Sequence, residues 1–252
     1  MLSLERRNDI ALLTLAHGKA NAFDLELCEA LIERFAECRA TPYAAVVITG
    51  HGSIFSAGVD LLRVLHDGPG YVSTFLPALS DALETVFTFP KPLVAAINGH
   101  AIAGGCILAC AADRRLMARG ETRIGVPELA VGVPFPPVPL EIVRFAVPPQ
   151  RAQELLLGGA TLQPDAAERF GLVDVVEEPD ALLDAAIAAA EAFASRPTAA
   201  FAMTKGQLRA PAVERMRSGR ARWDDEVTAL WSAPETFDAI RRYIDRTFRR
   251  ER

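Results

Sequence analysis

Apolar and polar positions follow two kinds of pattern along the first two thirds of the chain. Short, mostly apolar segments of strand length occur at Ile10 to Leu15, Ala44 to Gly50 and Leu93 to Asn98. The segments Asp24 to Arg39 and Val72 to Phe87 instead carry apolar residues every three to four positions, which is typical of amphipathic helices. This alternation of buried strands with helices predicts an α/β fold.

The pattern changes near Pro197. From residue 197 to residue 252 the sequence predicts only helices, with breaks near Pro211 and Pro234. We therefore divide the chain into a core, residues 1–196, and a helical C-terminal region, residues 197–252. Apolar faces of such an appendage must be covered by the core or by a second subunit, so we expect self-association.

Composition narrows the class of protein. The chain has 252 residues, half of them hydrophobic, which is enough to bury the core of one large domain. Its net charge of -5 is spread along the chain, so we expect no nucleic-acid partner. The four cysteines lack the paired C-x-x-C spacing of a structural zinc site, and we expect no metal.

The sequence also bears on localisation. The N-terminal segment lacks the basic and apolar regions of a secretory signal. The longest apolar run, Leu93 to Ala112, is interrupted by Asn98, Gly99 and His100, which favours a strand followed by a helix over a membrane span. We expect a soluble, cytoplasmic protein that does not associate with membranes.

Two small-residue segments follow apolar runs: IFSAGVDLL, Ile54 to Leu62, and NGHAIAGGCILAC, Asn98 to Cys110. A tight turn into a helix leaves main-chain N–H groups without intrahelical partners, and glycine allows such turns to approach closely. Two of these donors aimed at one point stabilise negative charge on a thioester or ester oxygen. Glu128, in IGVPELAVG, is a candidate acid/base beside them.

Other glycine-containing motifs do not fit the spacing. The sequence has no G-x-G-x-x-G that opens a helix and no G-x-x-x-x-G-K-[ST], which argues against dinucleotide and P-loop sites. It also has no G-x-S-x-G motif for a nucleophilic serine. Each glycine turn taken singly is compatible with plain helix–strand packing, whereas the two turns together with Glu128 favour a catalytic site.

Five segments carry a resemblance to a known family, in the family's order. They are KANAF (Lys19 to Phe23), FSAGVDL (Phe55 to Leu61), NGHAIAGGCILA (Asn98 to Ala109), IGVPELAVGV (Ile124 to Val133) and AAERFGLVDVV (Ala166 to Val176). On these segments the chain is identified as a member of the crotonase, or enoyl-CoA hydratase/isomerase, superfamily. The resemblance implies a spiral of ββα turns, a C-terminal helical trimerisation region, trimers or dimers of trimers, and an acyl-CoA substrate without a separate cofactor.

The resemblance also implies roles for individual residues. By position, the two oxyanion donors are the backbone N–H groups of Val59 and Gly104. The residues implied near the CoA adenine and pantetheine are Lys19, Ala22, Ser56 and Ala57. Lys19 is equally compatible with an ordinary surface position. We interpret Asp60 as a structural acceptor for local N–H groups. Lys205 matches a position that can reach a CoA phosphate, but a solvated lysine is the favoured interpretation.

The sequence departs from the family pattern at one position. Hydratases of the family use two glutamates, and Glu128 matches the second, whereas Ile107 stands at the first. An isoleucine can neither hold water nor carry a proton. A single carboxylate is enough to move a double bond, and an apolar neighbour excludes water and raises the pKa of that carboxylate. The residues thus favour a 3-enoyl-CoA to 2-enoyl-CoA isomerase with Glu128 as acid/base.

Other functions stay open at this point. The family also catalyses hydration or dehydration (lyase chemistry), thioester hydrolysis and decarboxylation on the same oxyanion hole. The residues that can supply a missing polar group are His66, Asp67, Tyr71 and Glu141, although surface or packing roles are favoured for all four. A non-catalytic acyl-CoA-binding subunit is a further alternative, against which a carboxylate beside an apolar pocket argues. Acyl-chain length depends on the loops at Leu62 to Thr74 and Phe135 to Val138.

Overall fold

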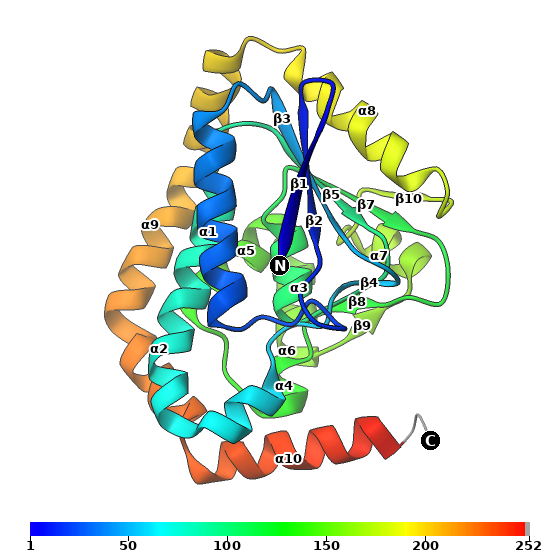
Figure 1. Cartoon of the computed structure of the whole chain (residues 1–252). Helices are drawn as coiled ribbons and strands as arrows, with labels where there is room; N and C mark the ends of the chain where they lie inside the picture. Colours follow the sequence, from blue (N-terminus) through cyan, green and yellow to red (C-terminus); the bar gives the residue numbers. More distant parts are fainter. Residues whose placement is uncertain (250–252) are drawn as a thin grey trace.

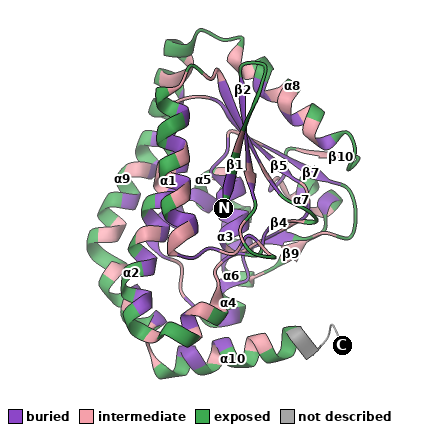
Figure 2. Cartoon of the chain, in the orientation of Figure 1, coloured by how far each residue is buried: buried purple, intermediate pink, exposed green. Residues whose placement is uncertain are grey.

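The larger of two sheets forms the centre of the molecule. The computed structural model describes residues 1–249. The six strands, in spatial order, are β1 (Leu2–Arg7), β2 (Ile10–Leu15), β3 (Ala45–Gly50), β5 (Leu93–Ile97), β7 (Arg114–Ala118) and β10 (Val175–Glu177). β1 and β2 form an antiparallel hairpin, and every other neighbouring pair is parallel. The central strands are buried on both faces, as their apolar sequences predict (Figure 2).

A second, smaller sheet lies beside the first. It contains β4 (Ile54–Ser56), β6 (His100–Ile102), β8 (Ile124–Gly125) and β9 (Thr161–Leu162), and only β9 runs antiparallel to its neighbour. Each of β4, β6 and β8 follows a strand of the large sheet and precedes a helix. The chain therefore repeats a ββα unit, which confirms the expected spiral.

Ten helices complete the described part of the chain. They are α1 (Leu25–Ala40), α2 (Leu61–Phe87), α3 (Gly104–Cys110), α4 (Glu128–Val131), α5 (Pro137–Ala146), α6 (Pro149–Gly158), α7 (Pro164–Phe170), α8 (Leu182–Ala194), α9 (Thr198–Trp231) and α10 (Pro234–Arg249). α8 covers one face of the large sheet through a small apolar cluster, while the main core lies on the other face with α1, α2, α3 and α5 (Figure 1).

The first helix forms for the reasons that its sequence suggests. The Asp24 carboxylate accepts a hydrogen bond from the Leu27 N–H at 2.8 Å and caps the N-terminus. Cys28, Leu31 and Phe35 are buried along one face. α1 thus packs its apolar stripe against the sheet and α2.

The second helix is longer than the sequence pattern predicts. α2 begins at Leu61, directly after Asp60, whose carboxylate accepts from the Arg63 N–H at 3.0 Å. Two helical segments meet at Gly68, where φ is 75° and the axis bends. The expectation of a loop from Leu62 to Thr74 is therefore wrong, because the cap at Asp60 starts a helix there.

The C-terminal region differs from the prediction at one point and agrees at another. The predicted break near Pro211 is wrong: α9 continues through it, because Ala212 and Met216 are buried in the core and α9 packs along α5. The break near Pro234 is confirmed, since α10 begins there. α10 then folds back across α4 and α2, at the lower edge of Figure 1. None of the helices described is both long and apolar enough to cross a bilayer.

Candidate active site

The first predicted donor lies in the turn between β4 and α2. Gly58 has a φ of 87°, a conformation that glycine adopts without steric cost. Beside it, Phe23 pairs with Val59 in a parallel bridge: the Phe23 N–H donates to the Gly58 carbonyl at 2.7 Å, and the Asp60 N–H donates to the Phe23 carbonyl at 2.9 Å. In parallel pairing these bonds use the groups flanking Val59, so the Val59 N–H points away from Phe23.

The second predicted donor opens α3. Gly104 is the first residue of this helix, where an N–H has no intrahelical acceptor. Ala103 before it has φ 51° and ψ −122°, a sparsely populated conformation, and its own N–H is tied to the Gly125 carbonyl at 2.8 Å. Among hydrogen bonds within the described residues, neither the Val59 nor the Gly104 N–H is a donor.

The two turns touch each other. A Cβ atom at Gly58 would lie 2.7 Å from the Ile102 carbonyl oxygen and 3.2 Å from the Gly104 nitrogen. A Cβ atom at Gly105 would lie 2.3 Å from the Ser56 carbonyl oxygen. Glycine at these positions is therefore required by the close approach of the β4 and β6 ends, which brings the two N–H groups to one place.

A narrow cavity of about 60 Å³ opens at this place. Val59, Gly104, Ile107 and Glu128 all line it. Its remaining walls are mainly apolar and consist of Ala57, Leu61, Leu79, Ile102, Ala103, Pro127, Val131, Val133, Phe135, Pro136, Pro139, Trp231 and Tyr243. The structure thus brings the predicted acid/base and both predicted donors to the wall of one apolar cavity.

Glu128 is the first residue of α4 and is almost fully buried. Its Oε2 atom is buried and has no hydrogen-bond partner among the described residues. Burial raises the pKa of this carboxyl from the ordinary 4.5 to about 8, because the charged form loses its hydration. An unpartnered buried carboxylate is costly for stability, and such groups are concentrated at functional sites.

Ile107 faces the same cavity from α3 and is 3% exposed. It lies three residues after Gly104, which places it on the same side of the helix as the donor. The side chain supplies only hydrocarbon at the position where the family's hydratases have their first glutamate.

The predicted CoA-contacting residues occupy different environments. Lys19 and Ala57 are exposed, Ala22 is half-buried, and Ala57 lines the cavity. Ser56 is fully buried, and its hydroxyl donates to the Asn21 carbonyl at 2.7 Å. Its side chain therefore holds the donor turn in place, so a CoA contact from Ser56 would have to use the main chain.

The sequence analysis missed Asn21, which lies within the KANAF segment. Asn21 is buried and has a φ of 49°. Its Nδ2 donates to the carbonyls of Ile54 and Phe55 at 3.0 and 3.1 Å, and its Oδ1 accepts from the His17 N–H at 2.8 Å. Asn21 thus fastens the 17–21 loop to β4, just before the first donor turn.

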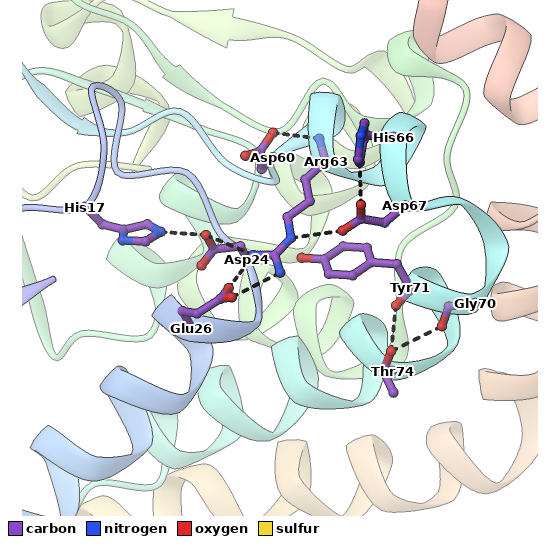
Figure 3. A network of polar contacts seen from close by, with 10 residues as sticks. All are labelled: His17, Asp24, Glu26, Asp60, Arg63, His66, Asp67, Gly70, Tyr71 and Thr74. Atoms are coloured by element: carbon purple, nitrogen blue, oxygen red, sulfur yellow. Dashed lines mark hydrogen bonds and ion pairs between the residues drawn. The ribbon is translucent and has the colours of Figure 1, made fainter.

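An ion-pair network fixes the other side of this turn (Figure 3). Arg63, in the first turn of α2, makes two bonds to the Glu26 carboxylate on α1 and a third to Asp67 at 3.2 Å. Asp24 lies 3.5 Å from the same guanidinium and accepts His17 Nε2 at 2.6 Å. The network joins the starts of α1 and α2, and Arg63 lies four residues after Val59.

The four residues considered as replacements for the missing glutamate lie elsewhere. His66 is exposed and contacts Asp67 (Figure 3), and Tyr71 packs beneath Arg63 with 4.9 Å between the ring centre and the guanidinium carbon. Glu141 is buried between Arg144 and Arg215. None of these four is among the described residues that line the cavity. Their positions agree with surface or packing roles.

The prediction that Lys205 is a solvated lysine is wrong. Its side chain is 6% exposed, and its ammonium lies 2.6 Å from Asp113 Oδ2 and 2.9 Å from the Lys91 carbonyl oxygen. The Asp113 carboxylate supplies the countercharge that permits burial of the Lys205 ammonium. Asp113 is far from Lys205 in the sequence, so the sequence analysis did not identify this pair. Lys205 lies at the starts of β5 and β7, whereas the donor turns follow the ends of the short strands.

Two residues of the C-terminal region line the cavity and were not anticipated as site residues. Trp231 is buried, and its indole N–H donates to the Pro134 carbonyl at 2.9 Å. Tyr243 reaches the cavity from α10, whose Ala239 packs so closely on Gly132 that a Cβ there would lie 2.8 Å away. The region expected to serve oligomerisation therefore also closes the site of its own chain.

A spiral of ββα turns carrying two unpaired main-chain donors and one buried carboxylate defines a class of enzymes that act on carbonyl compounds through an oxyanion. Comparisons with known proteins place the chain within this class. The enoyl-CoA hydratase/isomerase family model matches residues 5–244. A putative enoyl-CoA hydratase from Thermus thermophilus is 36% identical over 194 residues, which cover 75% of this chain and 76% of that protein.

Two solved structures extend the comparison. A Mycobacterium tuberculosis protein, named an enoyl-CoA isomerase in one structure and a probable enoyl-CoA hydratase in another, has a TM-score of 0.82 and 29% identity in the first. That match covers 90% of this chain and 97% of the other. Human mitochondrial delta3-delta2-enoyl-CoA isomerase has a TM-score of 0.94 with 22% identity, over 100% and 99% of the two chains, and shows a shared fold. The chain belongs to the enoyl-CoA hydratase/isomerase family of the crotonase superfamily, whose enzymes process acyl-CoA thioesters.

Proposed function

We propose that this protein is a 3-enoyl-CoA to 2-enoyl-CoA isomerase. The observation that carries the proposal is the pairing of Glu128 with Ile107. Of the described residues lining the cavity, Glu128 alone carries a carboxylate. Ile107 stands where the family's hydratases have their other glutamate, and its side chain is hydrocarbon. The Mycobacterium tuberculosis relative is named both an enoyl-CoA isomerase and a probable enoyl-CoA hydratase, so the proposal rests on the cavity residues and not on that name.

The proposed reaction needs one base and one oxyanion hole. The thioester oxygen accepts hydrogen bonds from the Val59 and Gly104 N–H groups. Glu128 removes a proton from carbon 2, the electrons move onto the thioester oxygen, and a dienolate forms. The Glu128 carboxylic acid returns the proton to carbon 4, which leaves the double bond between carbons 2 and 3. The raised pKa of Glu128, about 8, makes it a stronger base than an exposed glutamate.

The remaining parts of the proposal concern the rest of the substrate. CoA is part of the substrate, and its adenine and pantetheine lie near Lys19, Ala22 and Ala57. Ser56 supports the donor turn from behind with its side chain. The narrow cavity takes the reactive part of the acyl chain, and its apolar walls exclude water from the dienolate. Trimer formation through the C-terminal region is the assembly that we expect.

Hydration is the second candidate, because several relatives are named hydratases or dehydratases. The Thermus thermophilus relative is a putative enoyl-CoA hydratase, and a carnitinyl-CoA dehydratase from Salmonella arizonae is 35% identical over 188 residues. Addition of water needs a second polar group to hold the nucleophile. Ile107 cannot provide it, which favours isomerisation.

A paired absorbance assay tests the proposal. The purified protein is given a 3-enoyl-CoA and, separately, a 2-enoyl-CoA of equal chain length. We expect the conjugated enoyl absorbance to grow with the first substrate and to persist with the second. Glu128→Gln should lower the isomerisation rate by about 10²–10⁴-fold, while Glu154→Gln, an exposed carboxylate on α6, should leave it unchanged. Isomerisation that survives in the Glu128 variant would refute the role of that residue.

A further inference from the structure

A second cavity, of about 320 Å³, lies apart from the candidate active site and shares no lining residue with it. It is formed where the N-terminal half of α9 meets the ends of α3, α5 and α8. Its lining residues are Ala112, Asp113, Arg115, Phe145, Ala146, Phe193, Phe201, Thr204, Lys205, Leu208 and Arg209. Its volume falls within the range of small-molecule sites, about 300–1,000 Å³.

Three cationic side chains meet at this cavity. The side chains of Lys205, Arg209 and Arg115 are only 6%, 5% and 10% exposed. Asp113 accepts from Lys205 at 2.6 Å and from Arg209 at 2.7 Å, and Asp174 accepts from Arg115 at 2.8 Å. Two carboxylates therefore face three buried cations, which leaves one positive charge without a countercharge.

The hydrogen bonds of the cluster show the same imbalance. Both Asp113 oxygens already accept protons, and one of them also accepts the Leu93 N–H at 2.8 Å. Arg115 Nε is buried and has no partner among the described residues. Main-chain carbonyls accept further donors of the cluster: Lys205 donates to the Lys91 carbonyl, and Arg209 donates to those of Phe87 and Ala111. Within the described chain the cluster therefore keeps one buried donor without an acceptor, Arg115 Nε, and leaving a buried charged donor unpaired costs more than leaving a neutral one.

Desolvation acts on these cations as this imbalance implies. Burial lowers the pKa of Lys205 to about 8, despite the Asp113 carboxylate, and the neighbouring Arg209 charge lowers it further. Burial also lowers the pKa of Arg209. An added anion would offset both effects.

The rest of the cavity wall is apolar. Phe145, Phe193, Phe201 and Leu208 line it, and Phe193 and Phe201 stand 5.9 Å apart between ring centroids. Phosphate or another inorganic anion would satisfy the donors but leave these rings uncovered. A neutral hydrocarbon would cover the rings but leave the charge unpaired. Both parts of the wall are matched only by a ligand with one anionic end and one apolar end.

We propose that this cavity is a binding site for a small organic carboxylate with an apolar body, such as a medium-chain fatty acid anion. Its carboxylate pairs with the three cationic side chains that line the cavity, Arg115, Lys205 and Arg209. Its hydrocarbon part packs against Phe201, Phe193 and Leu208. The site lies at the starts of β5 and β7, so it is distinct from the thioester site, which lies beyond the opposite ends of these strands.

Calorimetric titration with octanoate tests the proposal, with octanol and inorganic phosphate as probes of the separate halves of the ligand. Leu208→Asp adds a negative charge at the mouth of the cavity, where the side chain is 65% exposed. Met203→Asp is the matched control, because Met203 has the same exposure on the same helix and does not line the cavity. A third variant, Arg115→Gln, removes one of the three positive charges together with the Nε donor that has no partner in the described part of the chain.

We expect saturable octanoate binding that weakens by at least about tenfold in Leu208→Asp and Arg115→Gln, since a charged hydrogen bond contributes about 1.5–3 kcal/mol. Met203→Asp should bind octanoate as the unmodified protein does, and octanol and phosphate should bind far more weakly. The proposal is overturned if octanoate does not bind, if octanol binds equally well, or if both aspartate variants bind alike. It is also overturned if Leu208→Asp only dissociates an oligomer, since a second copy would then fill the cavity.

Discussion

Replacement of Gly58 by alanine tests the proposed oxyanion hole. The new Cβ would lie 2.7 Å from both the Ile102 carbonyl oxygen and the Ala103 Cβ, and 3.2 Å from the Gly104 nitrogen. Real Cβ contacts almost never fall below 3.0 Å and ordinary ones begin at 3.4 Å, so the two turns must separate by 0.3 Å (3.0 minus 2.7 Å) and reach an ordinary contact at 0.7 Å (3.4 minus 2.7 Å). This movement acts directly on the Val59 and Gly104 donors.

The size of the effect follows from the geometry. Misplacement of a catalytic group by about 1 Å costs about 10²-fold in rate, and loss of one oxyanion donor costs about 10²–10³-fold. We therefore expect kcat/KM for isomerisation to fall by about 10²–10³-fold. The alanine also loses about 1–2 kcal/mol of stability, because Gly58 has a positive φ.

Gly52→Ala separates these two effects. Gly52 also has a positive φ, 72°, but a Cβ there meets nothing within 4 Å. Gly52→Ala should lose thermal stability only through its positive φ and should keep its activity toward a 3-enoyl-CoA. Gly58→Ala should lose that activity and also more stability, because its Cβ clashes with the Ile102 carbonyl oxygen. A folded Gly58→Ala protein with the kcat/KM of the unmodified enzyme would refute the placement of the two donors at this contact.

Three further predictions concern the acid/base and its neighbour. Because the base must be ionised and its pKa is about 8, kcat/KM should rise with pH up to about 8 and then level off; a profile already flat from pH 5 would contradict this. The raised pKa of Glu128 also means that its contribution to stability is fully present below pH 4.5 and is lost as pH rises to about 8. Chemical unfolding should therefore show that Glu128→Gln loses less stability than the unmodified protein between pH 5 and 8, by a few kcal/mol at about 1.4 kcal/mol per unit of pKa; parallel curves would argue against a buried ionising glutamate. Ile107→Glu should lower the isomerisation rate and produce measurable 3-hydroxyacyl-CoA from a 2-enoyl-CoA. Absence of this product would mean that Ile107 is not by itself the reason why water does not add.

Much of the fold follows from local sequence signals. Asp24 and Asp60 cap helices, and Gly171 ends α7 with a φ of 84°, because short polar side chains and glycine have strong conformational preferences. Pro211 misled the prediction because burial of Ala212 and Met216 outweighs the local cost of a proline within α9. Local preferences thus mark the start of α1 and the end of α7, but they missed the start of α2 at Leu61 and the continuity of α9.

The candidate site was predicted only as far as its residues lie in short motifs. Val59, Gly104 and Glu128 belong to segments whose spacing and resemblance mark them, and the structure brings them to one cavity. Trp231 and Tyr243 join that cavity through long-range packing of α9 and α10. Apolar periodicity marks such residues as buried but does not tell which cavity they face.

Lys205 illustrates the same limit for charged residues. Its partner Asp113 lies 92 residues earlier in the chain, directly before β7. A lysine on a helix is ordinarily solvated, and only the docking of α9 on the starts of β5 and β7 brings the two charges together. Ion pairs over such separations leave no periodic signal in the sequence.

Oxygen labelling tests the central claim most directly, because isomerisation moves a proton while hydration adds water. The protein is incubated with a 3-enoyl-CoA in ¹⁸O-labelled water, and the acyl products are identified by mass spectrometry. A single-glutamate isomerase with Ile107 against the reacting carbons yields 2-enoyl-CoA without label. Accumulation of labelled 3-hydroxyacyl-CoA in a Glu128-dependent reaction would contradict the account and establish a hydratase.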